Sequence, residues 1–324
     1  MDKVIYFGSS SFSKKILQAL IKAKIKPVLV ITKPDAPKGR GLKLYQTQVA
    51  KLSQDNNIEI IKPGNLEKAV FIDRIAKIKP NYLIVADYGK IIPNRLLSIP
   101  KILPLGIHPS LLPLYRGPAP IETTLINGEI ITGVTIFKLD KGIDTGPIIL
   151  QKTIKINSND TYFTLSEKLA NLGTEALVEV LYQIKNNFPN LKKQDEKKAT
   201  FAPKLSKQDG KINWKDSAEK IKNLIRATLN WPTAYTYHNN KILKITEAEN
   251  LEDKNKQNPA TITKVGKDGI YIATGSGILK MKKVKPEGKK EMPAWSFVCG
   301  HKIKEGDKFQ NVQSPKSLPR RQAG

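Results

Sequence analysis

The chain has 324 residues, 40% of them hydrophobic, and carries a formal net charge of +26. That length permits a sizeable core and favours two domains over one. No apolar stretch reaches the roughly 18 to 20 residues of a membrane span. The single cysteine, Cys299, excludes an internal disulfide and a cysteine-built zinc site. We therefore expect a cytoplasmic protein that does not contact membranes.

The positive charge is denser after residue 190 than before it. A field of this sign attracts polyanions, which makes nucleic acid the leading macromolecular partner. Lysines make up 48 of the 55 basic residues, so a general lysine bias is the alternative explanation.

The first half of the chain alternates strand and helix patterns. The apolar run 3–7 ends at Gly8 and is followed by helical spacing through Phe12, Ile16 and Leu20. Further strands are predicted at 28–31, 83–86 and 133–137, and helices near 46–57, 65–77 and 160–186. Buried strands interleaved with helices predict an α/β fold with a doubly wound, mainly parallel sheet. Ligands of such sheets bind at the carboxyl ends of the strands.

A nicotinamide-binding domain is the obvious competitor, and its fingerprint fails. After Gly8 the places of the second and third glycines hold Ser10 and Phe12 or Ser13. The second strand ends in Thr32-Lys33, with no acid for a ribose.

The segment 33–43 is a basic loop with two prolines, in which Arg40 stands between two glycines. Such a loop projects, and its guanidinium can contact phosphates or base edges. A solvated loop without a partner is the alternative.

The segment 103–120 holds one of only three histidines, His108, together with five prolines. It leads toward Asp144, which lies in a loop bracketed by glycines. A histidine with a nearby carboxylate suits acyl transfer or hydrolysis. The chain has no Gly-x-Ser-x-Gly elbow, and its one cysteine is remote, so we expect direct attack by one substrate on the other. A structural role for His108 is the alternative.

These motifs resemble those of the folate-dependent formyltransferases. The likeness is carried by His108 and the segments 110–113, 115–117, 132–136 and 140–146. Among these enzymes the chain is similar to the methionyl-tRNA formyltransferase family, through the loop 33–41, the segment 205–214 and Trp231-Pro232. The resemblance covers roughly residues 3–309 and rests on specific motifs in the first domain.

The resemblance implies transfer of a formyl group from 10-formyltetrahydrofolate to the amino group of methionyl initiator tRNA, in support of translation initiation. His108 would stabilise the oxyanion, and Asp144 would tune His108 and assist proton movement. The folate would lie against a larger set, namely Ile84, Val85, Ala86, Asp87, Tyr88, Ser110, Leu111, Leu112, Pro113 and Asp140. Arg40, flanked by Lys38 and Lys43, would contact the tRNA.

One position departs from the family pattern. Two residues before the histidine the family has an asparagine, and this chain has Gly106. Losing a side-chain donor at an oxyanion site typically costs about 100- to 1,000-fold in rate. We expect activity to be retained, because Gly106 adds no bulk.

The second half predicts a smaller β-barrel domain at 205–309, which the resemblance implies is OB-like, joined by a linker at 187–204 to the catalytic domain at 1–186. One helix is expected near 217–230, and five strands at 234–238, 241–247, 260–265, 269–274 and 277–284. A lysine-rich stretch with Lys282, Lys283 and Lys285 would meet tRNA phosphates. The tail 310–324 is predicted to be disordered.

Other interpretations remain open. The acceptor could differ, the enzyme could hydrolyse formyl-folate, or the chain could bind tRNA with an impaired pocket. His238 and His301 have no partners at ligand spacing, so no metal is expected. We expect a monomer.

Overall fold

The structure, a computed structural model, describes residues 2–38, 43–253 and 257–309. Its contacts divide the chain into two compact units. The first holds Met1–Thr124 and Glu129–Lys204, and the second holds Leu125–Gly128 and the chain from Leu205 on. The segment 187–204, predicted as a linker, therefore lies with the first unit. None of the helices in the described ranges combines the length and hydropathy that a membrane span requires.

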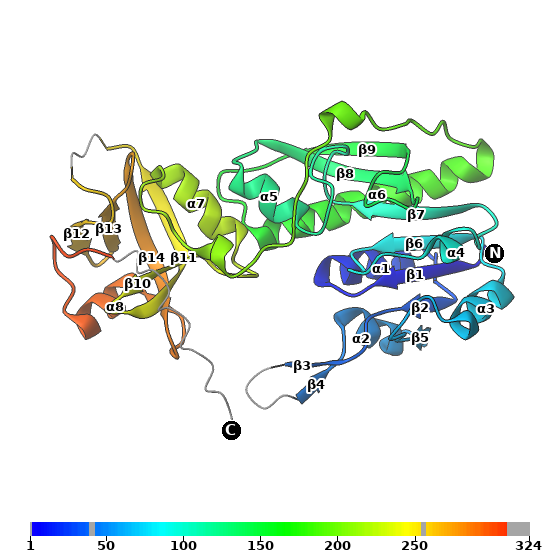
Figure 1. Ribbon diagram of the computed structural model, residues 1–324, viewed down its shortest axis with the longest axis horizontal. Helices are drawn as coiled ribbons and strands as arrows, with labels where there is room; N and C mark the ends of the chain where they lie inside the picture. Colours follow the sequence, from blue (N-terminus) through cyan, green and yellow to red (C-terminus); the bar gives the residue numbers. More distant parts are fainter. Residues whose placement is uncertain (1, 39–42, 254–256, 310–324) are drawn as a thin grey trace, which may run out of the picture. The chain divides into compact units, whose positions relative to one another are not determined.

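The first unit is an α/β fold (Figure 1). In chain order its elements are β1 (Val4–Gly8), α1 (Ser11–Lys22), β2 (Leu29–Ile31), β3 (Ala36–Lys38), β4 (Lys43–Tyr45), α2 (Gln48–Asp55), β5 (Glu59–Ile61), α3 (Ala69–Ile78), β6 (Tyr82–Ala86), α4 (Asn94–Leu97), β7 (Leu103–His108), α5 (Pro120–Ile126), β8 (Ile131–Lys138), β9 (Ile148–Lys155), α6 (Tyr162–Asn186) and the 3-10 helix η1 (Glu196–Lys198). The last two residues of α5 are grouped with the second unit.

Seven strands form one sheet in the order β5-β2-β1-β6-β7-β8-β9. The strands from β5 to β7 are parallel to one another, whereas β8 and β9 are antiparallel to their neighbours. The predicted doubly wound, mainly parallel sheet is confirmed. Strand order reverses between β1 and β6, so the crevice typical of this fold lies at the carboxyl ends of these two strands.

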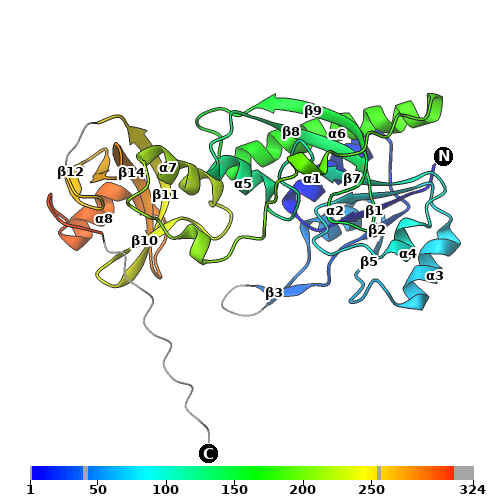
Figure 2. The same ribbon diagram turned by 45° about the horizontal axis from the view of Figure 1, so that its top comes forward.

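Helices cover both faces of this sheet. Ile5 and Phe7 of β1 pack with α3 and α4 on one face. Tyr6 points to the other face, where its hydroxyl contacts Ser13 of α1. This follows from the alternation of side chains along a strand. On the α1 side, α6 runs along β8 and β9 (Figures 1 and 2).

The second unit is built on an antiparallel sheet. Its elements are η2 (Gln208–Gly210), α7 (Ala218–Ala227), β10 (Tyr235–His238), β11 (Lys241–Leu251), β12 (Ile262–Gly266), β13 (Gly269–Ala273), β14 (Ile278–Pro286), β15 (Met292–Pro293) and α8 (Ala294–His301). The strand order is β10-β11-β14-β13-β12, with β15 paired to β14. A core around the buried Trp214 joins the sheet to α7 and α8. The predicted second, smaller β domain is confirmed.

Candidate active site

His108 is the last residue of β7, close to the carboxyl end of β6. Side chains alternate along the strand, so Gly106 and His108 share one face and Ile107 lies on the other. Ile107 packs toward Gly173 of α6. On the face of His108 its cross-strand neighbour is Thr135 of β8, and that of Gly106 is Phe137. The imidazole is therefore almost completely buried at the edge of the crevice.

Two groups orient the ring of His108. Its Nε2–H donates to the carbonyl oxygen of Tyr115 at 2.8 Å, because a carbonyl can only accept. Its Nδ1 lies 3.6 Å from Oδ2 of Asp144. The two residues that the sequence singled out are thus brought together. The carbonyl fixes the ring, and Nδ1 is the nitrogen that faces the carboxylate.

Asp144 occupies the loop after β8 in a left-handed backbone conformation, with φ of 54°. Its Oδ2 accepts a hydrogen bond of 2.9 Å from the amide of Gly117. Gln194 donates through Nε2 to the carbonyl oxygens of Asp144 and Gly146, at 2.8 and 2.7 Å. Loop and carboxylate are therefore held from two sides, which supports a conformation that is uncommon for a residue with a side chain.

Gln194 is itself held by the buried Arg116. The Nε and Nη2 atoms of Arg116 donate to Oε1 of Gln194 at 3.1 and 2.8 Å. Its Nη1 and Nη2 donate to the carboxylate of Glu196 at 2.7 and 2.8 Å. The hydrogen bonds to Glu196 raise the pKa of Arg116 and lower the pKa of Glu196. Sequence reasoning missed Gln194, since one glutamine in a lysine-rich segment without apolar spacing carries no signal.

Hydrogen bonds, including those from β8 and β9, brace the loop 110–113. The hydroxyl of Ser110 is buried and donates to the carbonyl of Leu114 at 2.6 Å. Thr135 donates to the Ser110 carbonyl and accepts from the Leu112 amide, at 2.7 and 3.0 Å. Gln151 donates to the carbonyl of Leu112 at 2.9 Å. Ser110 and Leu112 are buried, while Leu111 and Pro113 are partly exposed.

The residues 84–88, at the end of β6, likewise include both buried and exposed members. Ile84, Ala86 and Tyr88 are buried, whereas Val85 is partly exposed and Asp87 is exposed. The ring of Tyr88 packs edge-on against Phe7 with ring centroids 5.6 Å apart, and burial raises the pKa of its hydroxyl to about 12.

The carboxylate of Asp140 accepts hydrogen bonds within its own loop. One carboxylate oxygen accepts from the amide of Gly142 at 3.0 Å and from the hydroxyl of Thr145 at 2.7 Å. This carboxylate therefore shapes the turn that leads to Asp144. Its side chain is only partly exposed.

Glu122 in α5 is a titratable group that sequence reasoning missed. Burial, with a smaller contribution from the charge of Asp87, raises the pKa of its carboxyl to about 7. Perturbed carboxyls gather at functional sites more often than elsewhere. The sequence offered no signal, because a glutamate in the first turn of a helix is ordinary.

Two of the predicted tRNA contacts in the first unit, Lys38 and Lys43, are the last residue of β3 and the first residue of β4. Arg40 lies outside the described residues. Lys38 and Lys43 are paired across the hairpin through their backbones.

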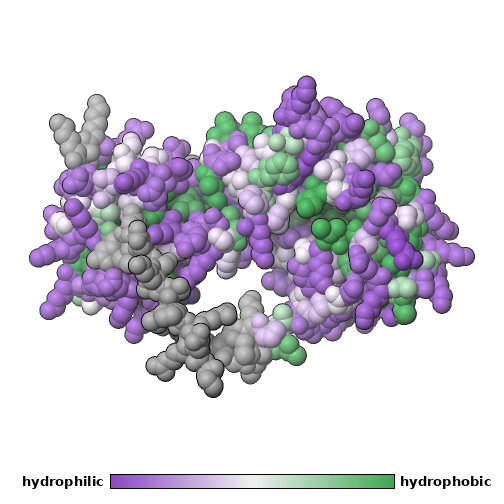
Figure 3. Space-filling model, viewed as in Figure 1, coloured by the Kyte–Doolittle hydropathy of each residue, from purple (hydrophilic) through white to green (hydrophobic). Residues whose placement is uncertain are grey.

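The predicted lysines of β14 differ from one another. Lys282 forms ion pairs with Glu249 at 2.9 Å and Glu247 at 3.4 Å, and Lys283 pairs with Glu247 at 2.7 Å. Lys285 instead faces Lys244 across the strand pair. Burial, followed by the charges of Lys285 and Lys207, lowers the pKa of Lys244. In the view of Figure 3, hydrophilic side chains cover most of the surface of this unit.

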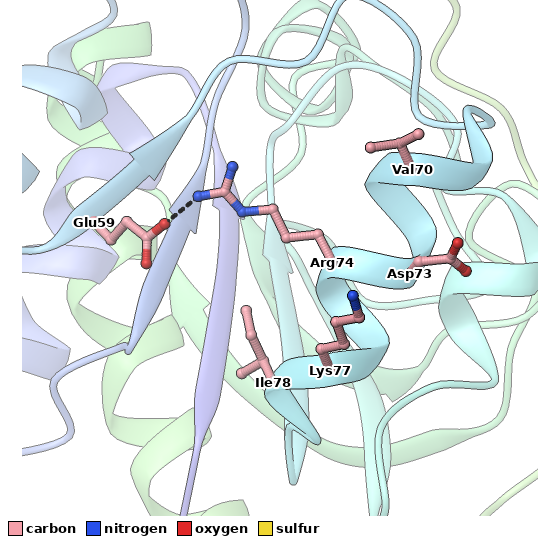
Figure 4. A pocket seen from close by; sticks show the side chains of 6 residues that line it. All are labelled: Glu59, Val70, Asp73, Arg74, Lys77 and Ile78. Carbon is pink, nitrogen blue, oxygen red and sulfur yellow. Dashed lines mark hydrogen bonds and ion pairs between the residues drawn. The ribbon is translucent and has the colours of Figure 1, made fainter.

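A cavity of about 590 Å³ lies elsewhere, between β5 and α3 (Figure 4). Glu59 and Arg74 form an ion pair across it, and Val70, Asp73, Lys77 and Ile78 complete the lining. It contains none of the predicted site residues. Within the described ranges, no group of three His, Cys, Asp or Glu side chains could hold a metal ion.

Comparison with known proteins identifies two matching family models. The model described as formyl transferase matches residues 2–181, and that described as formyl transferase, C-terminal domain, matches residues 204–302. A methionyl-tRNA formyltransferase from Thermodesulfovibrio yellowstonii is 43% identical over 303 residues, which is 94% of this chain and 97% of the relative. One from Caldicellulosiruptor saccharolyticus is 42% identical over 311 residues, 94% and 98% of the two chains.

Solved structures share the fold. An N-formyltransferase from Helicobacter canadensis, in complex with folinic acid and dTDP-3-aminofucose, has a TM-score of 0.63 at 23% identity and covers 87% of this chain and 99% of its own. HypX from Aquifex aeolicus, in complex with tetrahydrofolic acid, has a TM-score of 0.64 at 16% identity, over 91% of this chain and 46% of its own.

Proposed function

Because the chain belongs to the methionyl-tRNA formyltransferase family, we propose that it transfers a formyl group from 10-formyltetrahydrofolate to the amino group of methionyl initiator tRNA. The observation that carries the proposal is the approach of Asp144 to His108 at the end of β7. The hydroxyl of Ser110, two residues after His108, donates to the Leu114 carbonyl and not to His108. The geometry thus favours direct transfer without a covalent enzyme intermediate.

In the proposed reaction the amine nitrogen attacks the formyl carbon, and the carbonyl oxygen becomes an oxyanion. When the oxyanion collapses, the bond between the formyl carbon and N10 of the folate breaks. The amine loses one proton and N10 gains one, so the protons balance. The protein has to stabilise the oxyanion and to move this proton.

His108 and Asp144 are assigned these two tasks. Because Nε2–H donates to the Tyr115 carbonyl, Nδ1 is the ring nitrogen left to exchange a proton, and it faces Asp144. The oxyanion is proposed to form beside His108, whose ring the Tyr115 carbonyl holds in place. Asp144 passes the amine proton on, directly or through water.

The folate is proposed to bind at the open side of the crevice. Among the residues expected to contact it, Val85, Asp87, Leu111, Pro113 and Asp140 have exposed surface. The buried members, Ile84, Ala86, Tyr88, Ser110 and Leu112, would support the site from behind.

The tRNA is proposed to contact basic residues of both units. We propose this role for Arg40, Lys38 and Lys43 in the first unit and for Lys282, Lys283 and Lys285 in the second. All proposed catalytic groups come from one chain, so we propose a monomer. An acceptor that is a tRNA would place the activity in the cytoplasm.

The test supplies 10-formyltetrahydrofolate with methionyl initiator tRNA, methionyl elongator tRNA or no tRNA, and measures formyl-methionine and deformylated folate. Formylation selective for the initiator supports the proposal. Loss of the formyl group without tRNA would identify a hydrolase. If tRNA bound but no formyl group moved, the chain would be a tRNA-binding protein with an impaired pocket.

A further inference from the structure

The space next to His108 on its own face of β7 is filled from the neighbouring strand. Gly106 lies two residues before His108 and is paired with Phe137 of β8. A Cβ atom placed on Gly106 would lie 2.4 Å from Cε1 and 2.5 Å from Cζ of Phe137. It would also lie 2.9 Å from Cδ2 of Leu139. No side chain fits at position 106 while the Phe137 ring stays where it is.

The ring cannot give way freely. Phe137 is 2% exposed and forms a buried cluster with Leu112 and Ile148, against which Leu139 packs. A ring inside a close-packed cluster moves only if its neighbours move as well.

Those neighbours connect the ring to both sides of the proposed site. Leu112 belongs to the braced loop 110–113. Leu139 follows β8 directly and begins the loop that carries Asp144, and its amide donates to the Pro104 carbonyl of β7. A shift of the ring therefore displaces the loop beside His108, the loop of Asp144, or both.

We propose that Phe137 is a positioning residue for this site, whose ring takes the place of a side chain at position 106 and supports Leu112 and Leu139. A polar side chain beside His108 is thereby excluded by the ring and not merely missing from the sequence. Gly106 and Phe137 form one unit, so either residue tolerates a change in size only together with the other. This inference rests on the proposed function for its catalytic readout.

The experiment compares the wild-type protein with Gly106→Asn, Phe137→Leu and the double variant. Leucine lacks the two ring atoms nearest to Gly106 while it keeps an apolar side chain against Leu112. We expect Gly106→Asn to lower both Tm and kcat/KM, the latter by about tenfold or more, because overpacked cores force their neighbours to move. The double variant should recover most of both losses, which is the coupling expected of residues in contact.

Two further measurements separate positioning from mere stability. Gly64→Asn is the matched control, because nothing lies within 4 Å of a Cβ at Gly64, and it should match the wild type. Assayed well below its Tm, Phe137→Leu should raise the KM for the folate through Leu112 and lower kcat through the Asp144 loop. A residue with only a structural role would leave both constants unchanged in the folded protein, which would overturn the proposal.

Two other results also overturn it: wild-type Tm and kcat/KM in Gly106→Asn, or losses in the double variant that equal the sum of those in the single variants. The Tm comparison does not depend on catalysis. If even the wild type formylated no tRNA, the proposed function would fail, while the coupling in Tm would still decide whether the ring fills this space.

Discussion

Among the single residues around the crevice, Glu122 combines partial burial with a pKa raised to about 7. In the unfolded chain a glutamate ionises near pH 4.3. Between these values the folded state binds more protons than the unfolded state, so the free energy of unfolding falls as the pH rises through this range. Folding therefore favours the protonated, neutral form of Glu122.

The direction of this pH dependence gives a prediction for Glu122→Gln. The glutamine is neutral at every pH, so the variant should gain stability relative to the wild type as the pH rises from 5 to 8. The gain is at most about 3 kcal/mol, and less where solvent screens the carboxylate. Urea unfolding of both proteins at the two pH values measures it. An equal difference in stability at pH 5 and pH 8 would contradict the raised pKa.

At the same scale, the sequence was sufficient to single out His108 and Asp144 but not the residues that position them. His108 is one of only three histidines, and both candidates stand in a proline- and glycine-rich context. Gln194, Thr135 and Gln151 act through hydrogen bonds to backbone groups far away in the chain. Such contacts depend on the fold and leave no local pattern.

At the scale of elements, the segment 192–202 is part of the candidate site. Lys192 exchanges two backbone hydrogen bonds with Ile148, each 2.8 Å long. Thr200 and Ala202 pair with the backbone of Arg116, and Gln194 holds the loop of Asp144. The segment therefore fastens the chain around Arg116 to the loops on either side.

Replacing Gln194 by alanine tests this arrangement. The change leaves the carbonyls of Asp144 and Gly146 without their donor and removes one acceptor of the buried Arg116. Buried polar groups left unpaired cost about 1–3 kcal/mol each, so we expect the free energy of unfolding to fall by roughly 2–4 kcal/mol. The value of kcat should fall as well, measured at saturating substrate well below the Tm.

Lys197→Ala is the control for this change, since Lys197 is an exposed neighbour in the same segment. It should have little effect on kcat. Full activity in Gln194→Ala would show that the loop of Asp144 needs no support from this segment.

The sequence predicted the central elements better than the peripheral ones. The runs of β1, β6 and β8 are buried and apolar, and were found. The edge strand β9 alternates with exposed polar positions, and the edge strand β5 has only three residues, so both lack a clear strand pattern. The strand β7, which carries His108, contains Pro104 and Gly106, two residue types that disfavour strands. Its pairing between β6 and β8 outweighs that local preference.

At the scale of the whole molecule, the net charge of +26 should make tRNA binding strongly dependent on salt. The structure distinguishes among the lysines. Lys283 forms an ion pair with Glu247, whereas the ion pairs found among the described residues include none for Lys285.

We therefore expect Lys285→Ala to weaken tRNA binding and to reduce the slope of log affinity against log salt by about one. Lys283→Ala should change the slope less, because a carboxylate already compensates its charge. Titrations of each variant at several salt concentrations measure both effects. Equal slopes for the two variants would show that the ion pairs of β14 do not select the lysines that meet phosphate.

Formyl transfer is proposed to depend most on His108, and its rate in a single turnover measures this dependence most directly. Wild type and His108→Ala are each mixed, in excess over substrate, with labelled 10-formyltetrahydrofolate and methionyl initiator tRNA, and the formation of formyl-methionyl-tRNA is followed in a single turnover. We predict transfer by the wild type and a rate about 100- to 10,000-fold lower in His108→Ala, with tRNA binding retained. An unchanged rate in His108→Ala would contradict the account.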